Sequence, residues 1–403
     1  MSRTSIMTLS ALFFVPLVAW FKDAAVVVLA LGVVASLLSS GPLRPKGVLS
    51  LAKAPAGVSV CLLVLWCLFS ILWAPHFPST AWLKAFSTIV LGAILASALA
   101  GAQRGSIRQI AAATVVAVLV LLGLLLIERI TNGFFVGLAR PTETTDQLFN
   151  VMNGGLVLLC CTSFAVAGLL RLKTKTWQYP VLFLATVFAT TASYRMDAVP
   201  VAVGAGLLSF MIVLQWRVRA FVAVTVLIGI GAVSWPVLAS LATSADLHVW
   251  FTDNVHPNWG YRITIWGRVS ELIGQNFLIG YGFDSSRVIG ETAGLLPDAV
   301  GRTSFLHPHN GLLQIWLELG LVGVSLLLAA CTYLPRLTVK CSPSPLSLAV
   351  AAGTMTASVT IWLLSFGVWQ GWWLAVLGLT LSSVVLCFRL DGDDGQLQAS
   401  SAS

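Results

Sequence analysis

The chain carries little charge for its length. Only 9% of its 403 residues are charged, whereas 58% are hydrophobic and the mean hydropathy is +0.92. A water-soluble domain usually has about 25% charged residues. The shortage of charge therefore excludes a soluble enzyme. It predicts an all-α integral membrane protein, because a helix satisfies its own backbone hydrogen bonds within lipid.

Cysteines are few and poorly spaced for a structural site. The seven cysteines lie in apolar runs or in one short loop, and their spacing fits neither a metal site nor a disulfide framework. We interpret them as small residues of the membrane core. The first apolar run has no small-residue cleavage site before the next one begins, so we expect a membrane helix there and not a signal peptide.

Long apolar runs are abundant. Each is close to the length of about 20 residues that crosses the hydrocarbon layer of a membrane as a helix. We predict twelve such helices, centred within residues 6–21, 24–40, 57–73, 81–99, 109–127, 152–170, 177–193, 198–215, 220–242, 311–333, 346–366 and 369–388. An even number of crossings places both termini on the same side.

The distribution of positive charge predicts which side that is. The larger share of the 23 Lys and Arg residues falls on the side of the N-terminus, where every short loop carries at least two. By the positive-inside rule, both termini are expected in the cytoplasm. Because the net charge of +8 follows mostly from this topology, no nucleic-acid partner is predicted.

The same pattern divides the chain into four parts. Residues 1–242 are expected to form transmembrane helices one to nine, and residues 243–310 a long periplasmic loop that contains an interfacial helix. Residues 311–390 complete the set with helices ten to twelve. The polar residues 391–403 have few apolar side chains and are expected to form a disordered cytoplasmic tail.

The stretch HPHNGLLQIWLELG, residues 307–320, places unusual polar groups at the start of a membrane helix. Glu318 is the one acidic residue predicted inside a membrane helix, and an ionisable group at that depth is a functional candidate. Asn310, Gln314 and Glu318 are spaced by four residues, so they share one helix face and form a polar stripe that descends from His309. The alternative is that the stripe only forms hydrogen bonds between helices.

His309 is the strongest candidate for chemistry. Its imidazole titrates near neutral pH and lies at the expected water boundary, so it can accept a proton from a substrate hydroxyl. The alternative is an interfacial histidine with a structural hydrogen bond. His307, His309 and His256 together make only an incomplete set of metal ligands without a recognised spacing, so no metal is predicted.

A second segment, Gly260 to Asp284, predicts an amphipathic helix. In a helix over 262–273, one arc is apolar while Arg268 and Glu271 lie outside it, which is typical of a helix at the membrane interface. Arg262 lies in the middle of the apolar arc, which favours an anion partner over snorkelling. Tyr261, Trp266 and Tyr281 either anchor this helix or stack against sugars. The apolar arc consists of Ile265, Trp266, Val269, Leu272 and Ile273.

Arg195 is expected at the outer end of the seventh helix, with Asp197 as a possible ion-pair partner. Guanidinium groups bind phosphate through two parallel hydrogen bonds. Arg195, Arg262 and His309 on one membrane face therefore predict a site for a phosphate-bearing substrate.

The stretch HPHNGLLQIWLELGLVG resembles the signature of the O-antigen ligase and polymerase superfamily. In that signature a histidine and an asparagine open a helix that continues with a glutamate and two glycines, here His309, Asn310, Glu318, Gly320 and Gly323. The helix count, the long external loop and the YRITIWGR…GYGF element are similar too, so the resemblance covers most of the chain.

The resemblance implies an inverting glycosyltransferase of the GT-C type in the bacterial inner membrane, with its active site facing the periplasm and no cofactor. The implied donor is a glycan on undecaprenyl pyrophosphate, and the implied acceptor is a sugar hydroxyl of the lipid A core; membrane lipids surround the protein. His309 would deprotonate or orient the acceptor, and Arg195 and Arg262 would bind the pyrophosphate. The implied supporting residues are Asn310, Gln314, Glu318, Tyr261 and His307.

Two alternatives remain at this stage. An O-antigen or capsule polymerase extends lipid-linked glycans with the same signature residues. A transporter of lipid-linked substrates predicts paired halves and charges along a central pathway, but an internal repeat is lacking here and the unusual polar groups gather at one membrane face.

The two arginines of the amphipathic helix test the predicted arc. We expect Arg262→Ala to weaken use of the donor in a transfer assay, because it removes a cation from the apolar arc. Arg268→Ala should be tolerated, because Arg268 lies on the polar face. An equal loss of transfer in both variants would contradict the arc.

Overall fold

The computed structural model describes residues 3–37, 55–76, 80–142, 144–194, 198–292, 305–341 and 344–401. Regular structure in these ranges is helical. The elements are α1 (Arg3–Leu9), η1 (Ser10–Phe14), η2 (Pro16–Ala19), α2 (Ala24–Leu37), α4 (Pro55–Ser70), η3 (Ile71–Trp73), α5 (Ala81–Ala100), α6 (Arg104–Ile130), α7 (Phe134–Ala139), α8 (Thr145–Val151), α9 (Asn153–Thr174), α10 (Gln178–Ser193), α11 (Ala198–Ser244), α12 (Leu247–Asn254), α13 (Pro257–Gln275), α14 (Ser286–Thr292), α15 (Gly311–Cys341), α16 (Pro345–Leu364) and α17 (Gly371–Ser401).

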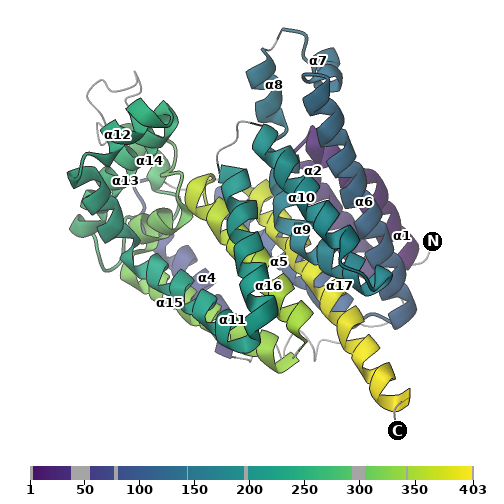
Figure 1. Ribbon diagram of the computed structural model, residues 1–403. Helices are drawn as coiled ribbons and strands as arrows, with labels where there is room; N and C mark the ends of the chain where they lie inside the picture. Colours follow the sequence, from purple (N-terminus) through teal and green to yellow (C-terminus); the bar gives the residue numbers. More distant parts are fainter. Residues whose placement is uncertain are drawn as a thin grey trace.

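Every predicted apolar run falls mainly in helical segments of the described residues, which fits a multi-pass membrane protein. Seven described helices are long and apolar enough to cross a membrane: α5, α6, α9, α11, α15, α16 and α17. Helix α11 contains a break at Arg217 (φ 53°, ψ −133°), so it covers two predicted runs whose directions differ (Figure 1). Twelve crossings stay a prediction.

Two parts of the prediction differ from the structure. The first run is divided among α1, a π-helical turn and a 3-10 turn, because Pro16 lacks the backbone N–H that a regular helix requires. The tail expected to be disordered continues as helix α17 to Ser401. Asp391 accepts a hydrogen bond from the hydroxyl of Ser347 on α16, which holds the start of the tail against the helix bundle.

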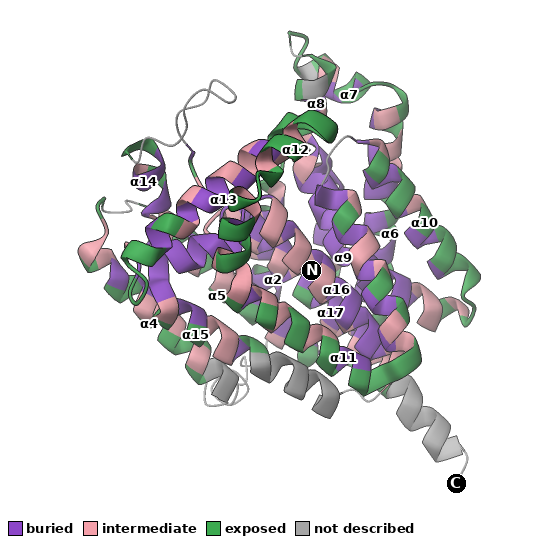
Figure 2. Ribbon diagram, turned by 60° about the vertical axis from the view of Figure 1, so that its left-hand side comes forward, coloured by how far each residue is buried: buried purple, intermediate pink, exposed green. Residues whose placement is uncertain are grey.

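The helices pack around two hydrophobic cores. The larger core is built on α9, whose residues from Gly154 to Leu169 are all buried, together with α2, α6, α16 and α17. The smaller core lies between α13, α15 and the second half of α11. Figure 2 shows buried residues concentrated in α9 and α13, while α10 and α11 expose much of their length.

Helix α13 confirms the predicted amphipathic arc. Ile265, Trp266, Val269, Leu272 and Ile273 are all buried, whereas Glu271 is exposed. The apolar arc packs against α11, α12 and α15, so its burial is achieved within the protein. Placement of this helix at the membrane interface stays a prediction.

Helix α15 is broken at Gly320 (φ 63°, ψ −164°), and the segment after α13 pairs with the break. The N–H groups of Tyr281 and Gly282 donate to the carbonyls of Leu317 (2.9 Å) and Glu318 (2.8 Å). In the other direction, Leu321 N–H donates to the Phe277 carbonyl at 2.9 Å. These bonds replace those that the helix loses, so the break leaves few unsatisfied groups at membrane depth.

Glycine is required on both sides of this contact. A Cβ added to Gly320 would lie 2.5 Å from the carbonyl oxygen of Leu278, and one added to Gly280 (φ 68°) would lie 2.5 Å from that of Glu318. Both atoms belong to the backbone and cannot rotate away. Gly320 of the predicted signature and Gly280 of the GYGF element therefore allow two chain segments to approach each other closely.

We expect Gly320→Ala to lower the free energy of unfolding by on the order of 2 to 4 kcal/mol, through backbone strain and overlap with Leu278. Gly229→Ala in α11 is the matched control. Nothing lies within 4 Å of a Cβ at Gly229, so its stability should stay the same or rise by up to about 1 kcal/mol. Thermal unfolding of the purified protein in detergent checks both, and equal stabilities would contradict the close-approach argument.

Candidate active site

His309 lies in the short connection before α15 and has a left-handed backbone (φ 53°). Its Nδ1 is 3.0 Å from the carbonyl oxygen of Ser365, which follows α16. Because a carbonyl oxygen only accepts, Nδ1 carries the proton, and the neutral ring holds its lone pair on Nε2. Trp266 donates from Nε1 to the Pro308 carbonyl at 2.9 Å, so α13 also positions this connection.

His307 supports His309. The two ring centroids are 4.4 Å apart, and the backbone N–H of His309 donates to Nδ1 of His307 at 3.2 Å. The pKa of His307 is lowered to about 3, chiefly by burial, and electrostatic interactions with His309, Arg287 and Arg262 act in the same direction. His307 is therefore neutral at physiological pH and too weakly basic to take a proton from a hydroxyl.

Asn310 does not continue the polar stripe as the spacing predicts. Its Oδ1 accepts from the backbone N–H of Leu313 at 3.0 Å, which caps the N-terminus of α15. The first turn of a helix has N–H groups without intrahelical partners, and this local demand engages the side chain before it can join Gln314.

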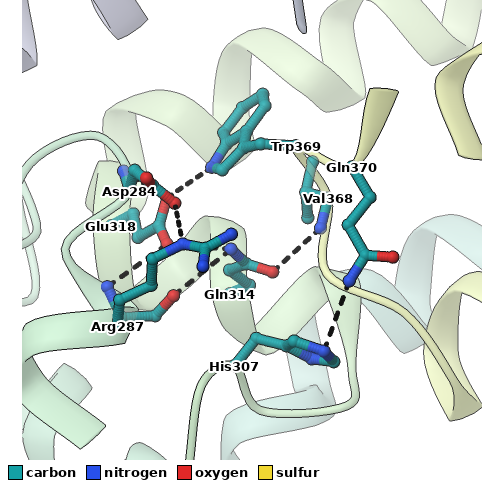
Figure 3. A network of polar contacts seen from close by, with 9 residues as sticks. Asp284, Arg287, His307, Gln314, Glu318, Val368, Trp369 and Gln370 are labelled. Carbon is teal, nitrogen blue, oxygen red and sulfur yellow. Dashed lines mark hydrogen bonds and ion pairs between the residues drawn. The ribbon is translucent and has the colours of Figure 1, made fainter. Parts of the chain in front are cut away.

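Glu318 lies at the centre of a buried hydrogen-bond network, shown in Figure 3. The carboxylate accepts from the backbone N–H of Asp284 (2.9 Å) and from Trp369 Nε1 (2.6 Å). It also accepts from Gln314 Nε2 (2.9 Å) and from the backbone N–H of Ser286 (3.4 Å). Glu318 thus joins α15 to the α13–α14 connection and to the α16–α17 connection.

Gln314 extends the network. Its Oε1 accepts from the backbone N–H of Val368 at 2.9 Å, and its Nε2 also donates to the hydroxyl of Ser286 at 3.3 Å. The hydrogen-bond partners of Gln314 and Glu318 lie on other segments of this protein. This geometry fits the alternative in which the polar stripe forms hydrogen bonds between helices.

The arginines of α13 differ as the arc predicts. Arg268 is bonded to Glu271 at 2.7 Å, and the two side chains are 36% and 63% exposed. Arg262 is half-buried, with its guanidinium 5.0 Å from the ring centroid of Trp259, and its charge acts on His307. Arg262 therefore belongs to the surroundings of the histidine pair and Arg268 to the surface.

The other predicted residues are placed as follows. Tyr261 is half-buried against the smaller core, and Tyr281 donates from its hydroxyl to Gln275 Oε1 at 3.1 Å, as an anchoring residue does. His256 caps α13, because its Nδ1 accepts from the Asn258 N–H. Arg195 and Asp197 lie outside the described residues. Where the structure describes side chains, no group of three metal-binding residues occurs.

A cavity of about 950 Å³ lies where the two hydrophobic cores meet. Val26 and Trp372 belong to the side of the larger core, and Trp369 to that of the smaller one. Three cations line it: Lys22, Lys84 and Arg287. The remaining lining residues are Asp23, Val27, His76, Thr80, Ala81, Ser87, Thr88, Asp284, Gln370 and Gly371.

The histidine pair lies beside this cavity. Gln370, which lines the cavity, has its Nε2 3.5 Å from Nε2 of His307, as Figure 3 shows. The cavity thus has a cationic lining next to the strongest candidate base. The sequence pattern used Lys22 and Lys84 only for topology, although Lys22 lies between the first two apolar runs and Lys84 near the start of the fourth, on the side expected to face the periplasm.

A second buried carboxylate, Glu128, was also missed because it follows the predicted apolar run. It accepts from Trp20 Nε1 (2.6 Å) and from the backbone N–H groups of Phe135 (3.2 Å) and Val136 (3.1 Å). The neighbouring Arg129 donates from Nε to the Ser193 carbonyl at 2.7 Å. These bonds fix α7 and the end of α10, directly before Arg195 in the sequence.

Comparisons with known proteins find one family model and several similar proteins. Residues 180–328 match the family model described as O-antigen ligase, a range that includes α13, His307, His309 and Glu318. Proteins with the provisional name of polysaccharide ligase are similar over more of the chain. One from Rickettsia conorii is 25% identical over 319 residues, which cover 78% of this chain and 75% of that protein. One from Rickettsia bellii is 25% identical over 318 residues, covering 77% and 75%.

A third, from Rickettsia typhi, is 27% identical over 258 residues, which cover 62% of this chain and 61% of that protein. The matched range and the bundle of apolar helices confirm the resemblance drawn from the sequence. The chain is thus similar to O-antigen ligases over residues 180–328 and to polysaccharide ligases over most of its length.

Proposed function

We propose that this protein transfers a glycan from undecaprenyl pyrophosphate to a sugar hydroxyl of the lipid A core. The observation that carries the proposal is the cation-lined cavity of about 950 Å³ beside His307 and His309. A ligase for lipid-linked glycans needs room for two sugars, positive charge for a pyrophosphate, and a positioned group that handles a hydroxyl proton.

The donor is already activated, because its sugar is attached to a good leaving group. The protein has to hold the charge of that leaving group and place the attacking hydroxyl in line with the breaking bond. In this proposal Lys22, Lys84 and Arg287 bind the anionic groups inside the cavity. Arg262 binds the pyrophosphate from the side of the histidines, Arg195 is a second proposed pyrophosphate-binding residue, and no metal is required.

His309 handles the acceptor. With Nδ1 held by the Ser365 carbonyl, the lone pair of the neutral ring lies on Nε2, which can receive a hydroxyl proton or orient the hydroxyl. His307, neutral and bonded to the His309 backbone, keeps the ring in place. In-line attack inverts the configuration at the sugar carbon.

The proposal includes the membrane setting. The protein acts as a GT-C glycosyltransferase of the bacterial inner membrane with about twelve crossings, both termini in the cytoplasm and the active site facing the periplasm. The polar network of Glu318 and the cavity lie toward the same end of the bundle as α13 and α14, where a lipid-linked donor and a lipid-anchored acceptor meet.

We expect purified wild-type protein to transfer glycan from undecaprenyl pyrophosphate to lipid A core in the presence of EDTA. His309→Ala should lower the rate at least about 100-fold, because it removes the group that receives the acceptor proton or orients the acceptor hydroxyl, while Arg268→Ala stays near wild type. Product analysis on gels and thermal unfolding separate activity from folding. Longer lipid-linked chains without core product would identify a polymerase, and neither product would contradict an enzyme.

Lys84 tests the role of the cavity. We expect Lys84→Gln to raise the KM for the lipid-linked donor about 10- to 100-fold, because one charge-assisted hydrogen bond to phosphate contributes about 1.5 to 3 kcal/mol. Lys173→Gln, on the exposed end of α9, is the matched control for loss of a lysine. An unchanged KM in Lys84→Gln would show that the donor does not use this cavity.

A further inference from the structure

Asp284 has features that a structural role alone does not require. It has a left-handed backbone (φ 57°), its side chain is only 10% exposed, and it lines the cavity. Asp is among the few residues that tolerate this conformation, at a cost. Such a conformation persists where the surroundings impose it, and it is common at functional sites.

The surroundings of Asp284 fix its backbone on both sides. Its own N–H donates to Glu318 Oε2 at 2.9 Å, and the N–H of Ser286 donates to Oε1 of the same carboxylate. The preceding Phe283 donates its N–H to the hydroxyl of Ser70 at 3.1 Å. The buried network thus fixes the backbone of Asp284, which Figure 3 shows near Glu318 and Arg287.

The carboxylate faces the charged lining of the cavity. Its Oδ1 accepts from Arg287 Nε at 3.3 Å, and the Arg287 side chain is 56% exposed. Burial raises the pKa of Asp284 above its ordinary value, while Arg287 and His76 oppose part of that rise. The ionisable groups around it from every neighbouring element are Arg287 of α14, Glu318 of α15, His76 after η3, Lys84 of α5, and Lys22 and Asp23 before α2.

Other candidates for proton acceptance are less suitable. His307 is too weakly basic, and Asp23 is exposed to solvent on a connection between helices. His309 is not among the residues that line the cavity. Asp284 combines a fixed position, partial burial and direct access to the space between the cations.

We propose that Asp284 is the general base of the transfer reaction, and that His309 orients the acceptor. This inference rests on the proposed function. The acceptor oxygen forms a bond to the anomeric carbon while the bond from that carbon to the pyrophosphate oxygen breaks. The electron pair of the broken bond leaves with the pyrophosphate, which the cavity cations stabilise, and the hydroxyl proton passes to Oδ of Asp284.

The test compares wild type with Asp284→Asn in the core-transfer assay across pH. Asparagine tolerates a left-handed backbone and keeps an oxygen that accepts from Arg287, so mainly the basicity is removed. We expect kcat to fall at least about 100-fold, with KM within about threefold. Wild-type kcat should decline as the pH falls through the raised pKa of Asp284, because the base must be deprotonated; this acid limb should vanish in Asp284→Asn.

The matched control is Asp246→Asn, because Asp246 is also an aspartate with positive φ (53°) but lies outside the cavity, before α12. Asp284→Gly provides a readout that a structural role would not change. Glycine suits the backbone and leaves space for a small carboxylate, so acetate should restore transfer in a concentration-dependent way, whereas sodium chloride at the same ionic strength should not.

The outcomes separate this inference from the proposed function. Loss in Asp284→Asn together with rescue of Asp284→Gly by acetate supports the assignment. An active wild type with Asp284→Asn within threefold of it overturns the assignment and leaves the function intact. Loss without rescue, with an unchanged acid limb, assigns Asp284 a structural role and also overturns it. A wild type without product overturns both.

Discussion

The burial of one carboxylate determines much of this structure. Glu318 lies inside an apolar helix, where a charged group without partners is very unfavourable. Four donors from three separate segments satisfy it: Asp284 and Ser286 N–H, Gln314 Nε2 and Trp369 Nε1. Because removing any segment would leave the carboxylate under-satisfied, the three segments are held in a single arrangement.

The break in α15 is the second part of the same arrangement. A straight helix would leave no room for the α13–α14 connection beside Glu318, whereas the turn at Gly320 opens backbone groups that pair with Phe277, Tyr281 and Gly282. The side chain of Glu318 and the backbone bonds at the break therefore hold the same α13–α14 connection in place. The α13–α14 connection and the start of α14 place Asp284 and Arg287 in the cavity lining.

The cavity is lined by residues that pack against two separate hydrophobic cores. Elements from the N-terminal part supply Lys22 and Lys84, and elements from the second half supply Arg287 and Gln370. Charges that are distant in the sequence share one space as a result. Their shared position gives the cavity three cations that can act together on one anion.

The sequence by itself predicted a membrane environment and the helical segments, and it proposed His309 and Glu318 as candidate functional residues. Low charge and long apolar runs predicted the membrane bundle, and the helical period predicted which side of α13 is buried, since both depend on local spacing. Only the tertiary structure decided that Glu318 binds Asp284 and that Lys22 and Lys84 share a cavity with Arg287. These contacts join segments up to hundreds of residues apart, and their geometry depends on how the two cores pack, which no local pattern encodes.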